Sequence, residues 1–205
     1  MPKNTFFNLP KDKRNKIIKC AKKEFSKYNF YDASINRIIK EANISRGSFY
    51  QYFENKEDLF IYLLGKFRDR ILSDLEHEII DGNCDIFQFQ LLIFDYITTK
   101  VVKSKDKDFI ISIICNMDIR LEKHLSQFIQ CKEFTSVDKL PPHIKSTKNI
   151  RINEDNELEI LNNLLISSLI NELVAFFTIS KSLESCRESL MVTADILKHG
   201  VINNK

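Results

Sequence analysis

Residues 44–59 read "ISRGSFYQYFENKEDL", and the order of small, polar and aromatic residues in this stretch predicts two consecutive helices. Ser45 is a favoured N-cap residue, so we expect a short helix from it to about Tyr52, with the apolar Phe49 facing inward. Asn55 can cap the next helix, whose first turn carries carboxylates that suit the positive end of the helix dipole. The short helix would therefore expose a polar face and be followed at once by a longer helix.

A further helix is expected immediately before this stretch. Residues 34–42 place isoleucines on one face, and Ser34 can cap the helix that they form. Asn43 lies in the tight turn that follows, and after glycine asparagine is the residue that best tolerates a left-handed backbone. Two helices joined by such a turn have the layout of a helix-turn-helix, whose second helix enters the major groove of DNA.

The remaining apolar residues also recur at helical rather than alternating spacing, and glycine and proline number only four each among 205 residues. We therefore expect an all-α fold. The polar segment 132–156 contains two consecutive prolines and is expected to be a connection rather than a helix. The helices are expected at residues 10–28, 34–42, 45–52, 55–82, 85–103, 107–117, 118–131, 156–180 and 183–201.

Composition limits the class of protein and its location. Hydrophobic residues make up 43% and charged residues 29% of the chain, which is ordinary for a soluble globular protein. The N-terminus lacks the apolar core of a signal peptide, and Asn171 and Glu172 interrupt the most apolar segment. We therefore expect a cytoplasmic protein with no membrane partner.

Motifs for catalysis and metal binding are missing from the sequence. It has no phosphate-cradling glycine loop, no Gly-x-Ser-x-Gly and no His-Glu-x-x-His, so we do not expect an enzyme. The five cysteines are scattered and include no Cys-x-x-Cys pair. We expect reduced, mostly buried thiols, with no disulfide framework, no metal site and no cofactor.

Charge is distributed unevenly along the chain. Residues 1–56 contain 13 Lys and Arg against 5 Asp and Glu, a net charge of +8, whereas residues 57–205 have a net charge of −5. Residues 1–56, which we call the head, are thus basic, and the rest of the chain is acidic. This contrast indicates that only the head binds a polyanion. The basic residues at 11–23 could instead simply face solvent. Charge alone therefore does not decide whether the head binds a polyanion.

One run of residues carries a family resemblance. In residues 48–59 a small residue, an apolar residue, Tyr-x-Tyr-Phe and then Asn-Lys-Glu-x-Leu follow one another. This run, within residues 12–64, resembles the tetracycline-repressor (TetR/AcrR) family of bacterial transcription regulators. The resemblance implies a three-helix helix-turn-helix domain at 1–55 and a helical effector-binding and dimerisation domain at 56–205. Further matching residues are Ile18, Ala21, Phe25, Phe30, Ser34, Ile35, Ile38 and Ala42.

Side chains of the second helix of the helix-turn-helix suit base and phosphate recognition. Arg46 can make two hydrogen bonds to guanine, Gln51 can pair with adenine, and Gly47 lets the backbone come close. Lys56 lies beside the next helix N-terminus and could grip a phosphate. The tyrosines could instead be half-buried packing residues. The residues expected to contact DNA, by resemblance and by these properties, are Ser34, Asn36, Arg37, Ser45, Arg46, Gly47, Ser48, Tyr50, Gln51, Tyr52 and Lys56.

The helix expected at 156–180 is apolar on two sides and needs two surfaces to cover it. One side can face the monomer core and the other a second chain; a helix wholly wrapped within one subunit is the alternative. The resemblance implies a homodimer formed by the last two helices, which would recognise a near-palindromic operator. The candidate interface residues are Ile166, Ile170, Val174, Phe177, Leu190 and Leu197.

The resemblance also implies a small effector bound by the C-terminal domain. Most of its phenylalanines belong to the core, and the remainder could line a pocket for a lipophilic molecule. We therefore expect a homodimeric repressor that a lipophilic effector releases from double-stranded operator DNA. The alternative is a DNA-binding regulator or architectural protein without such a ligand, controlled by a protein partner. The candidate pocket residues are Phe94, Tyr96, Phe109, Asn116, Phe128 and Phe176.

Overall fold

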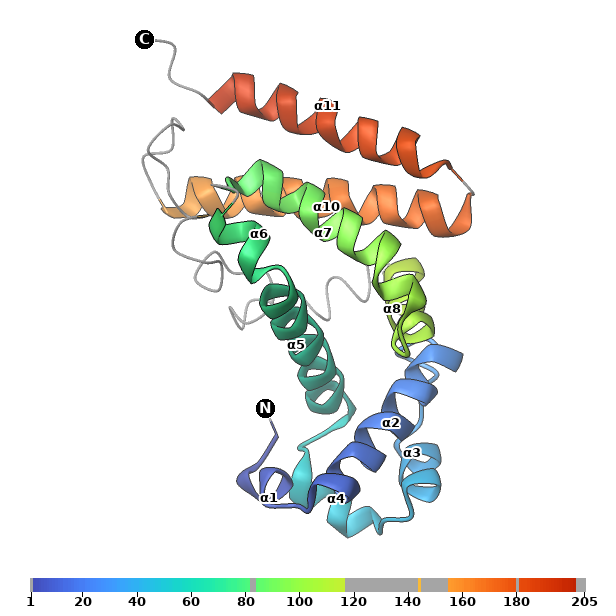
Figure 1. The fold of residues 1–205 in the computed structure, drawn as a ribbon. Helices are drawn as coiled ribbons and strands as arrows, with labels where there is room; N and C mark the ends of the chain where they lie inside the picture. The colour runs from blue at the N-terminus through green and yellow to red at the C-terminus, as the bar shows by residue number, and fades with distance from the viewer. Residues whose placement is uncertain (1, 82–83, 117–143, 145–154, 180, 202–205) are drawn as a thin grey trace. The chain divides into compact units, whose positions relative to one another are not determined.

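A computed structural model describes the protein except at residues 1, 82–83, 117–143, 145–154, 180 and 202–205 (Figure 1). Every regular element within the described residues is a helix, which confirms the predicted all-α class. The chain divides into two compact units, one of residues 1–69 with 105–124 and the other of residues 70–104 with 125–205.

The first unit holds the three-helix head that the sequence predicts. Asn55 caps the helix after the head, because its Oδ1 accepts a hydrogen bond from the Asp58 amide at 2.7 Å. A four-residue helix at 4–7 was not predicted, since so short an element has no periodicity to detect. The helices of this unit are α1 (Asn4–Phe7), α2 (Lys11–Lys27), α3 (Ile35–Ala42), α4 (Arg46–Tyr52), the first part of α5 (Lys56–Asp74) and α8 (Lys107–Cys115).

Aromatic side chains fill the core of the first unit. Phe53 is fully buried, and its ring centre lies 4.7 Å from that of Phe6 and 5.6 Å from that of Phe49. The ring centres of Phe60 in α5 and Phe25 in α2 are 4.9 Å apart. The first turns of α5 therefore pack against the head. The compact unit therefore extends beyond the domain boundary predicted at residue 55.

Helix α8 also packs within the first unit, against α2. Lys22 Nζ lies 2.7 Å from Asp106 Oδ1, and Ser112 Oγ donates a hydrogen bond to the carbonyl of Phe25 at 2.9 Å. These partners are more than 80 positions apart in the chain. The spacing of apolar residues within one helix gives no information about such distant partners. The packing of α8 against the head was therefore not predicted from the sequence.

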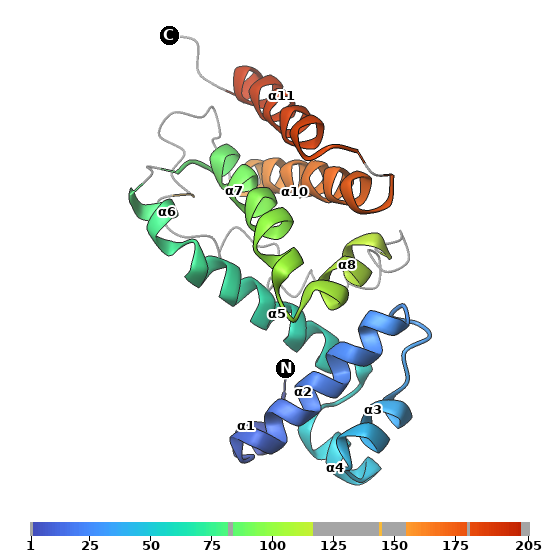
Figure 2. The same ribbon diagram turned by 45° about the vertical axis from the view of Figure 1, so that its right-hand side comes forward.

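Helices α7, α10 and α11 form the described core of the second unit, where α11 runs alongside α10 and α7 contacts both (Figures 1 and 2). Gln90 of α7 donates from Nε2 to the carbonyl of Leu165 at 2.8 Å, and Arg187 Nε lies 3.1 Å from Asp95 Oδ1. The elements of this unit are the end of α5, α6 (Glu76–Asp81), α7 (Ile86–Thr99), the 3-10 helix η1 (Val101–Lys103), α10 (Asp155–Thr178) and α11 (Leu183–Val201).

One predicted helix is divided in two. The sequence predicts a continuous helix over 55–82, but α5 ends at Asp74 and α6 begins at Glu76. The amide of Leu75 still bonds to the Ile71 carbonyl at 3.0 Å, and the Ile79 amide bonds to the Leu75 carbonyl at 2.9 Å. The break is therefore a local irregularity in a run of buried apolar residues.

The helix predicted at 118–131 and most of the connection at 132–156 lie outside the described residues.

One described helix has the length and composition of a membrane span. Residues Asn156–Thr178 of α10 contain a window with a mean hydropathy of 1.6, so the run stays strongly apolar despite Asn171 and Glu172. Only 28% of that window is buried within the chain. Length and composition alone are weak evidence for a membrane, because helices that bury an apolar face against protein pass the same test.

The described cysteines are free thiols. Cys20, Cys84 and Cys186 are buried and Cys115 is half-buried, as expected for reduced structural thiols, whereas Cys131 lies outside the described residues. Burial raises the pKa of the Cys84 thiol to about 11, so its reactive thiolate is scarce at neutral pH. The part of the chain that the structure describes contains no group of three or more His, Cys, Asp or Glu residues that could hold a metal ion.

Candidate nucleic-acid interface

The turn between α3 and α4 has the conformation that the sequence predicts. Asn43 has φ 57° and ψ 51°, in the left-handed region. Its amide bonds to the Lys40 carbonyl at 3.3 Å, and the Ile44 amide bonds to the Ile39 carbonyl at 3.0 Å. This pair of hydrogen bonds closes the end of α3 as a Schellman motif and fixes the direction in which α4 leaves.

Helix α4 is capped at its start and buried along one side. The Ser45 hydroxyl accepts a hydrogen bond from the Ser48 amide at 3.0 Å, which confirms the predicted cap. Phe49 is fully buried, so the opposite side of α4 faces solvent. Of the predicted DNA contacts, the exposed residues are Asn36, Arg37, Ser45, Arg46, Gly47, Tyr50 and Gln51, and the half-buried residues are Ser34, Ser48 and Lys56.

Three exposed side chains from α3 and α4 lie close together. Arg46 Nη1 donates to Asn36 Oδ1 at 3.4 Å, and the Arg46 guanidinium lies 5.8 Å from the centre of the Tyr50 ring. A guanidinium, an amide and a phenol are groups that contact base edges and phosphates. This outer surface of α3 and α4 is the candidate interface.

The fold does not require a glycine at position 47. A Cβ atom added there would meet only Ser45 Oγ, at 3.9 Å, and Gly47 does not have a positive φ. Space around Gly47 is therefore open on the exposed side of α4. A glycine that lowers helix propensity without a steric reason is consistent with close approach by another molecule.

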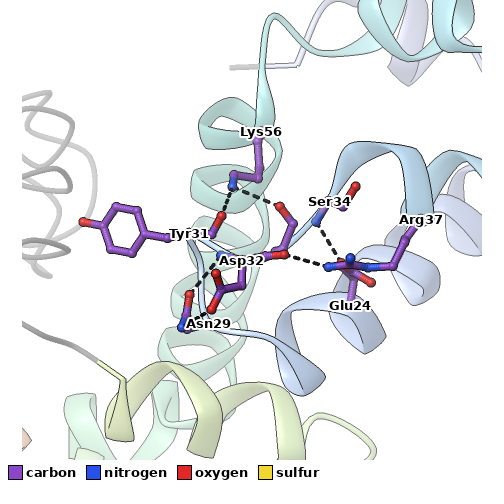
Figure 3. Close-up of polar contacts among 8 residues, drawn as sticks. Glu24, Asn29, Tyr31, Asp32, Ser34, Arg37 and Lys56 are labelled. Carbon is purple, nitrogen blue, oxygen red and sulfur yellow. Dashed lines mark hydrogen bonds and ion pairs between the residues drawn. The ribbon is translucent and has the colours of Figure 1, made fainter.

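Glu24 holds the corner between α2 and α3 (Figure 3). Its side chain is 7% exposed, and its Oε1 accepts from the Ser34 amide at 2.8 Å and from Arg37 Nε at 2.7 Å. The hydrogen bond to Glu24 raises the pKa of the Arg37 guanidinium. The Cζ atom of Arg37 also lies 4.0 Å from the centre of the Tyr28 ring. Arg37 thus uses much of its donor capacity inside the head, although its side chain stays 46% exposed.

Lys56 is bound within the protein (Figure 3). Its Nζ donates to the carbonyls of Tyr31 and Ala33 at 3.1 and 3.0 Å and lies 4.8 Å from the centre of the Phe30 ring. Burial lowers the pKa of the Lys56 ammonium group. Lys56 therefore holds the loop before α3, and its contact with a phosphate stays a prediction.

Two sequence-based assignments in the head need correction. Tyr52 is 6% exposed, with its ring 6.2 Å from Phe6, so it packs in the core as the alternative interpretation held. Its place at the inward side of α4 leaves it no surface for a base. Ser34 occupies the N-cap position of α3, but its side chain makes no capping hydrogen bond. The amide of Ser34 itself donates to the carboxylate of Glu24.

In the second unit, one apolar side of α10 is buried, as predicted. The exposure of the other residues changes the set of candidates for the dimer interface. Leu190 is 0% exposed, because it lies on the inward face of α11, so it cannot belong to an interface. The other five interface candidates are half-buried. The most exposed apolar residues of α10 and α11, none of them among the predicted interface residues, are Ile160, Leu164, Met191, Val192 and Ile196, and Ile179 just after α10 is also exposed.

The six pocket candidates do not lie in one unit. Phe94, Tyr96 and Phe176 belong to the second unit, whereas Phe109 and Asn116 belong to the first. Phe128 lies outside the described residues. The composition of the effector pocket stays a prediction.

Two structural features of the candidate interface were not predicted from the sequence. Glu24 shares its buried helix face with Ile17, Ala21 and Phe25, and a carboxylate at such a position was the signal that could have revealed it. The segment at residues 2–7 contacts the end of α4. No local pattern could have shown that pairing.

Two family models match the chain. The model described as "Bacterial regulatory proteins, tetR family" matches residues 17–63, and "Tetracyclin repressor-like, C-terminal domain" matches residues 85–201. The second match alone covers more than half of the chain.

Known proteins and structures show the same similarity. The "Uncharacterized HTH-type transcriptional regulator YdgC" of Bacillus subtilis is 34% identical over 71 residues, which is 35% of this chain and 36% of that protein. The "Fatty acid metabolism regulator protein" of B. subtilis is 32% identical over 75 residues, 33% and 39% of the two chains. The chain thus aligns with little more than a third of each relative. The crystal structure of FadR from B. subtilis in complex with stearoyl-CoA shares the fold, with a TM-score of 0.56 and 15% identity over 88% of this chain and 96% of that chain.

Proposed function

The chain belongs to the TetR family of bacterial regulatory proteins, and on that premise we propose that it is a homodimeric transcriptional repressor. It would bind a near-palindromic operator and leave it when a small lipophilic effector binds. The matched family consists of regulators, in agreement with the expectation that the chain is not an enzyme. The observation that supports DNA binding is the exposed cluster of Asn36, Arg46 and Tyr50 beside a rigid turn.

Recognition would use α4 in the major groove. Residues near the N-terminus of a recognition helix contact base edges, and Arg46 and Gly47 are the first two helical residues of α4. Arg46 would read guanine, and Gln51 would lie deeper along the same exposed side. Because Lys56 is engaged by two carbonyls, phosphate contacts would come mainly from the exposed basic residues of the head.

Selection of duplexes from random-sequence DNA tests the proposal. The selected duplex should contain two related half-sites and bind about 10³-fold more tightly than an unrelated duplex of the same length. An architectural DNA-binding protein would bind both duplexes alike. Equal affinities would therefore remove the repressor proposal and favour the alternative.

Arg46→Ala is expected to weaken binding to the selected duplex by about 1–3 kcal/mol, mostly through one base pair. The loss follows from removal of a two-pronged hydrogen bond to guanine. Competition titrations against duplexes altered at each position would measure it. Arg46→Lys is the matched control: it keeps the charge but loses the two-pronged geometry, so it should lose discrimination while retaining much of the non-specific affinity. Equal losses on every sequence would contradict the base-reading role.

Gly47→Ala is expected to affect stability and DNA binding in opposite directions. Alanine should raise the free energy of unfolding by about 0.5–1 kcal/mol, because glycine is disfavoured inside a helix. The added methyl group would stand between α4 and DNA and lower operator affinity. Thermal unfolding and binding titrations on the same samples measure both effects. Gly65→Ala in α5 is the control, since no atom lies within 4 Å of its added Cβ; both variants retaining full affinity would contradict the close approach.

Exposed apolar residues support the dimer. Ile160 and Leu164 of α10 and Val192 and Ile196 of α11 are each more than half exposed, although they are large and apolar. A second copy of the same two helices would cover them in a two-fold symmetric interface. Such symmetry would place two copies of α4 on two half-sites of the operator.

For the effector we propose a long-chain acyl-CoA. FadR of B. subtilis, whose fold is similar, was crystallised with stearoyl-CoA, and a relative from the same organism is named "Fatty acid metabolism regulator protein". Helix α7 of this chain is rich in buried apolar residues such as Phe94 and Ile97, which suits an acyl chain. Release requires that the ligand bind the DNA-free shape more tightly, and coupling of about 1–3 kcal/mol is typical.

Operator affinity with stearoyl-CoA, with coenzyme A alone and without ligand tests the effector class. We expect roughly 5- to 150-fold weaker binding with stearoyl-CoA only, the range that this coupling gives. Unchanged affinity in all three would exclude acyl-CoA, and control by another ligand or by a protein partner would then be the better proposal.

A further inference from the structure

The end of α4 is closed by residues that lie outside the segment matched by the family model, which begins at residue 17. The Lys3 amide donates to the Tyr52 carbonyl at 2.8 Å, and Lys3 Nζ donates to the Tyr50 carbonyl at 2.8 Å. The Thr5 hydroxyl donates to the carbonyl of Gln51. The last three carbonyls of the helix are therefore each bound by the segment at residues 2–7, which we call the N-terminal arm.

The arm is itself anchored in the core. Phe6 is 0% exposed, and its ring lies 4.7 Å from Phe53 and 5.4 Å from Tyr62 of α5. Arg14 of α2 donates from Nη1 to the Phe7 carbonyl at 2.9 Å. The groups that bind the end of α4 are thus followed directly by two residues, Phe6 and Phe7, that are fixed to the rest of the unit.

Helix α4 has a physical need for such a closure. It has only seven residues, and a helix of that length is not stable by its own hydrogen bonds. The carbonyls of a last turn have no partner within the helix, and a cation near them interacts favourably with the helix dipole. Ser45 closes one end of α4 and the N-terminal arm closes the other, so both ends of the recognition helix are held.

We propose that the N-terminal arm is a positioning element for the recognition helix, with Lys3 and Thr5 acting as its cap. The proposal rests on the proposed DNA-binding function, because an ordered last turn keeps Tyr50 and Gln51 in place for the operator. The arm need not touch DNA. Its effect is on the fraction of molecules whose α4 is fully formed, and apparent affinity falls in proportion to that fraction.

The double variant Lys3→Met/Thr5→Val tests the proposal, since it removes both side-chain donors and retains Phe6 in the core. Hydrogen–deuterium exchange should become about fivefold faster or more at the amides of residues 51–53, with little change in α2. Affinity for the selected duplex should fall only in proportion to the fraction of molecules whose α4 stays fully formed, so the fall is smaller than the rise in exchange as long as most molecules keep the helix. The dependence of affinity on salt should change no more than in the control.

Lys13→Met is that control, because Lys13 is an exposed lysine of α2 and its loss removes the same charge. If the double variant and Lys13→Met show the same exchange at residues 51–53, the arm is not a cap and the proposal is overturned. The exchange measurement needs no DNA. Failure of the wild-type protein to prefer any duplex would refute the proposed function instead, without affecting the exchange result.

Discussion

Leu164→Glu is expected to separate the proposed dimer into monomers and to lower operator affinity by more than about a hundredfold, because binding through two linked heads is lost. Leu164 is 51% exposed, and Ile160, four residues earlier on the same side of α10, is 58% exposed. Two-fold symmetry would place both copies of the new carboxylate in the apolar interface, without a partner cation. Burying an unpaired charge costs several kcal/mol, which is large beside the stability of an ordinary dimer.

Sedimentation at micromolar concentration and titration with the selected duplex measure this loss. Asn163→Glu is the matched control, since it adds the same charge on the adjacent polar side of α10, where Asn156 and Glu159 are also exposed. The control should remain dimeric and bind the duplex normally. A Leu164→Glu protein that stayed dimeric with full affinity would show that this side of α10 does not form the interface.

Phe53→Ala is expected to lower the free energy of unfolding of the first unit by about 3–5 kcal/mol, the usual cost of truncating a buried phenylalanine. Phe53 follows α4 directly and is fully buried, with rings of Phe6, Phe49 and Tyr62 centred 4.7, 5.6 and 6.2 Å away. The substitution would leave a cavity where α4, α5 and the N-terminal arm meet. Since a whole domain is stable by only about 5–15 kcal/mol, DNA binding should become marginal at 37 °C.

Denaturant unfolding followed by a probe in the head would measure the loss. Phe53→Leu is the control, because it fills much of the same volume and should cost clearly less. A much larger loss of unfolding free energy in Phe53→Ala than in Phe53→Leu would indicate a cavity. Similar losses in both variants would indicate that position 53 tolerates no substitution. An alanine variant destabilised by less than about 1 kcal/mol would mean that the aromatic cluster is not the main core of the unit.

Most of the helices and part of the candidate interface could be predicted from the sequence. The left-handed Asn43 and the cap at Ser45 were both predicted, because each depends on residues within about four positions. The sequence also predicted that one of the two apolar sides of α10 faces the core of the chain, and leucines of α10 such as Leu161 and Leu165 are buried. The outward position of Arg46 follows from the same periodicity.

What the sequence could not decide was the choice of partner for a polar group. Lys56 looked like a phosphate anchor by its place at a helix start, yet it binds carbonyls 23 and 25 positions earlier. Lys3 looked like part of a basic head, yet its ammonium group binds the end of a helix 47 positions later. Leu190 was predicted to lie in the dimer interface, but its burial within the chain excludes it.

The sequence by itself determined most of the helical segments, the caps at Ser45 and Asn55 and the apolar sides of the helices, because these properties arise from neighbours along the chain. Only the tertiary structure showed that Arg37 binds Glu24, that Tyr52 packs in the core, that Lys56 binds the loop before α3 and that residues 2–7 close α4. The physical reason is that a donor bonds to whichever acceptor the packing brings within about 3 Å, and packing joins residues that are remote in sequence.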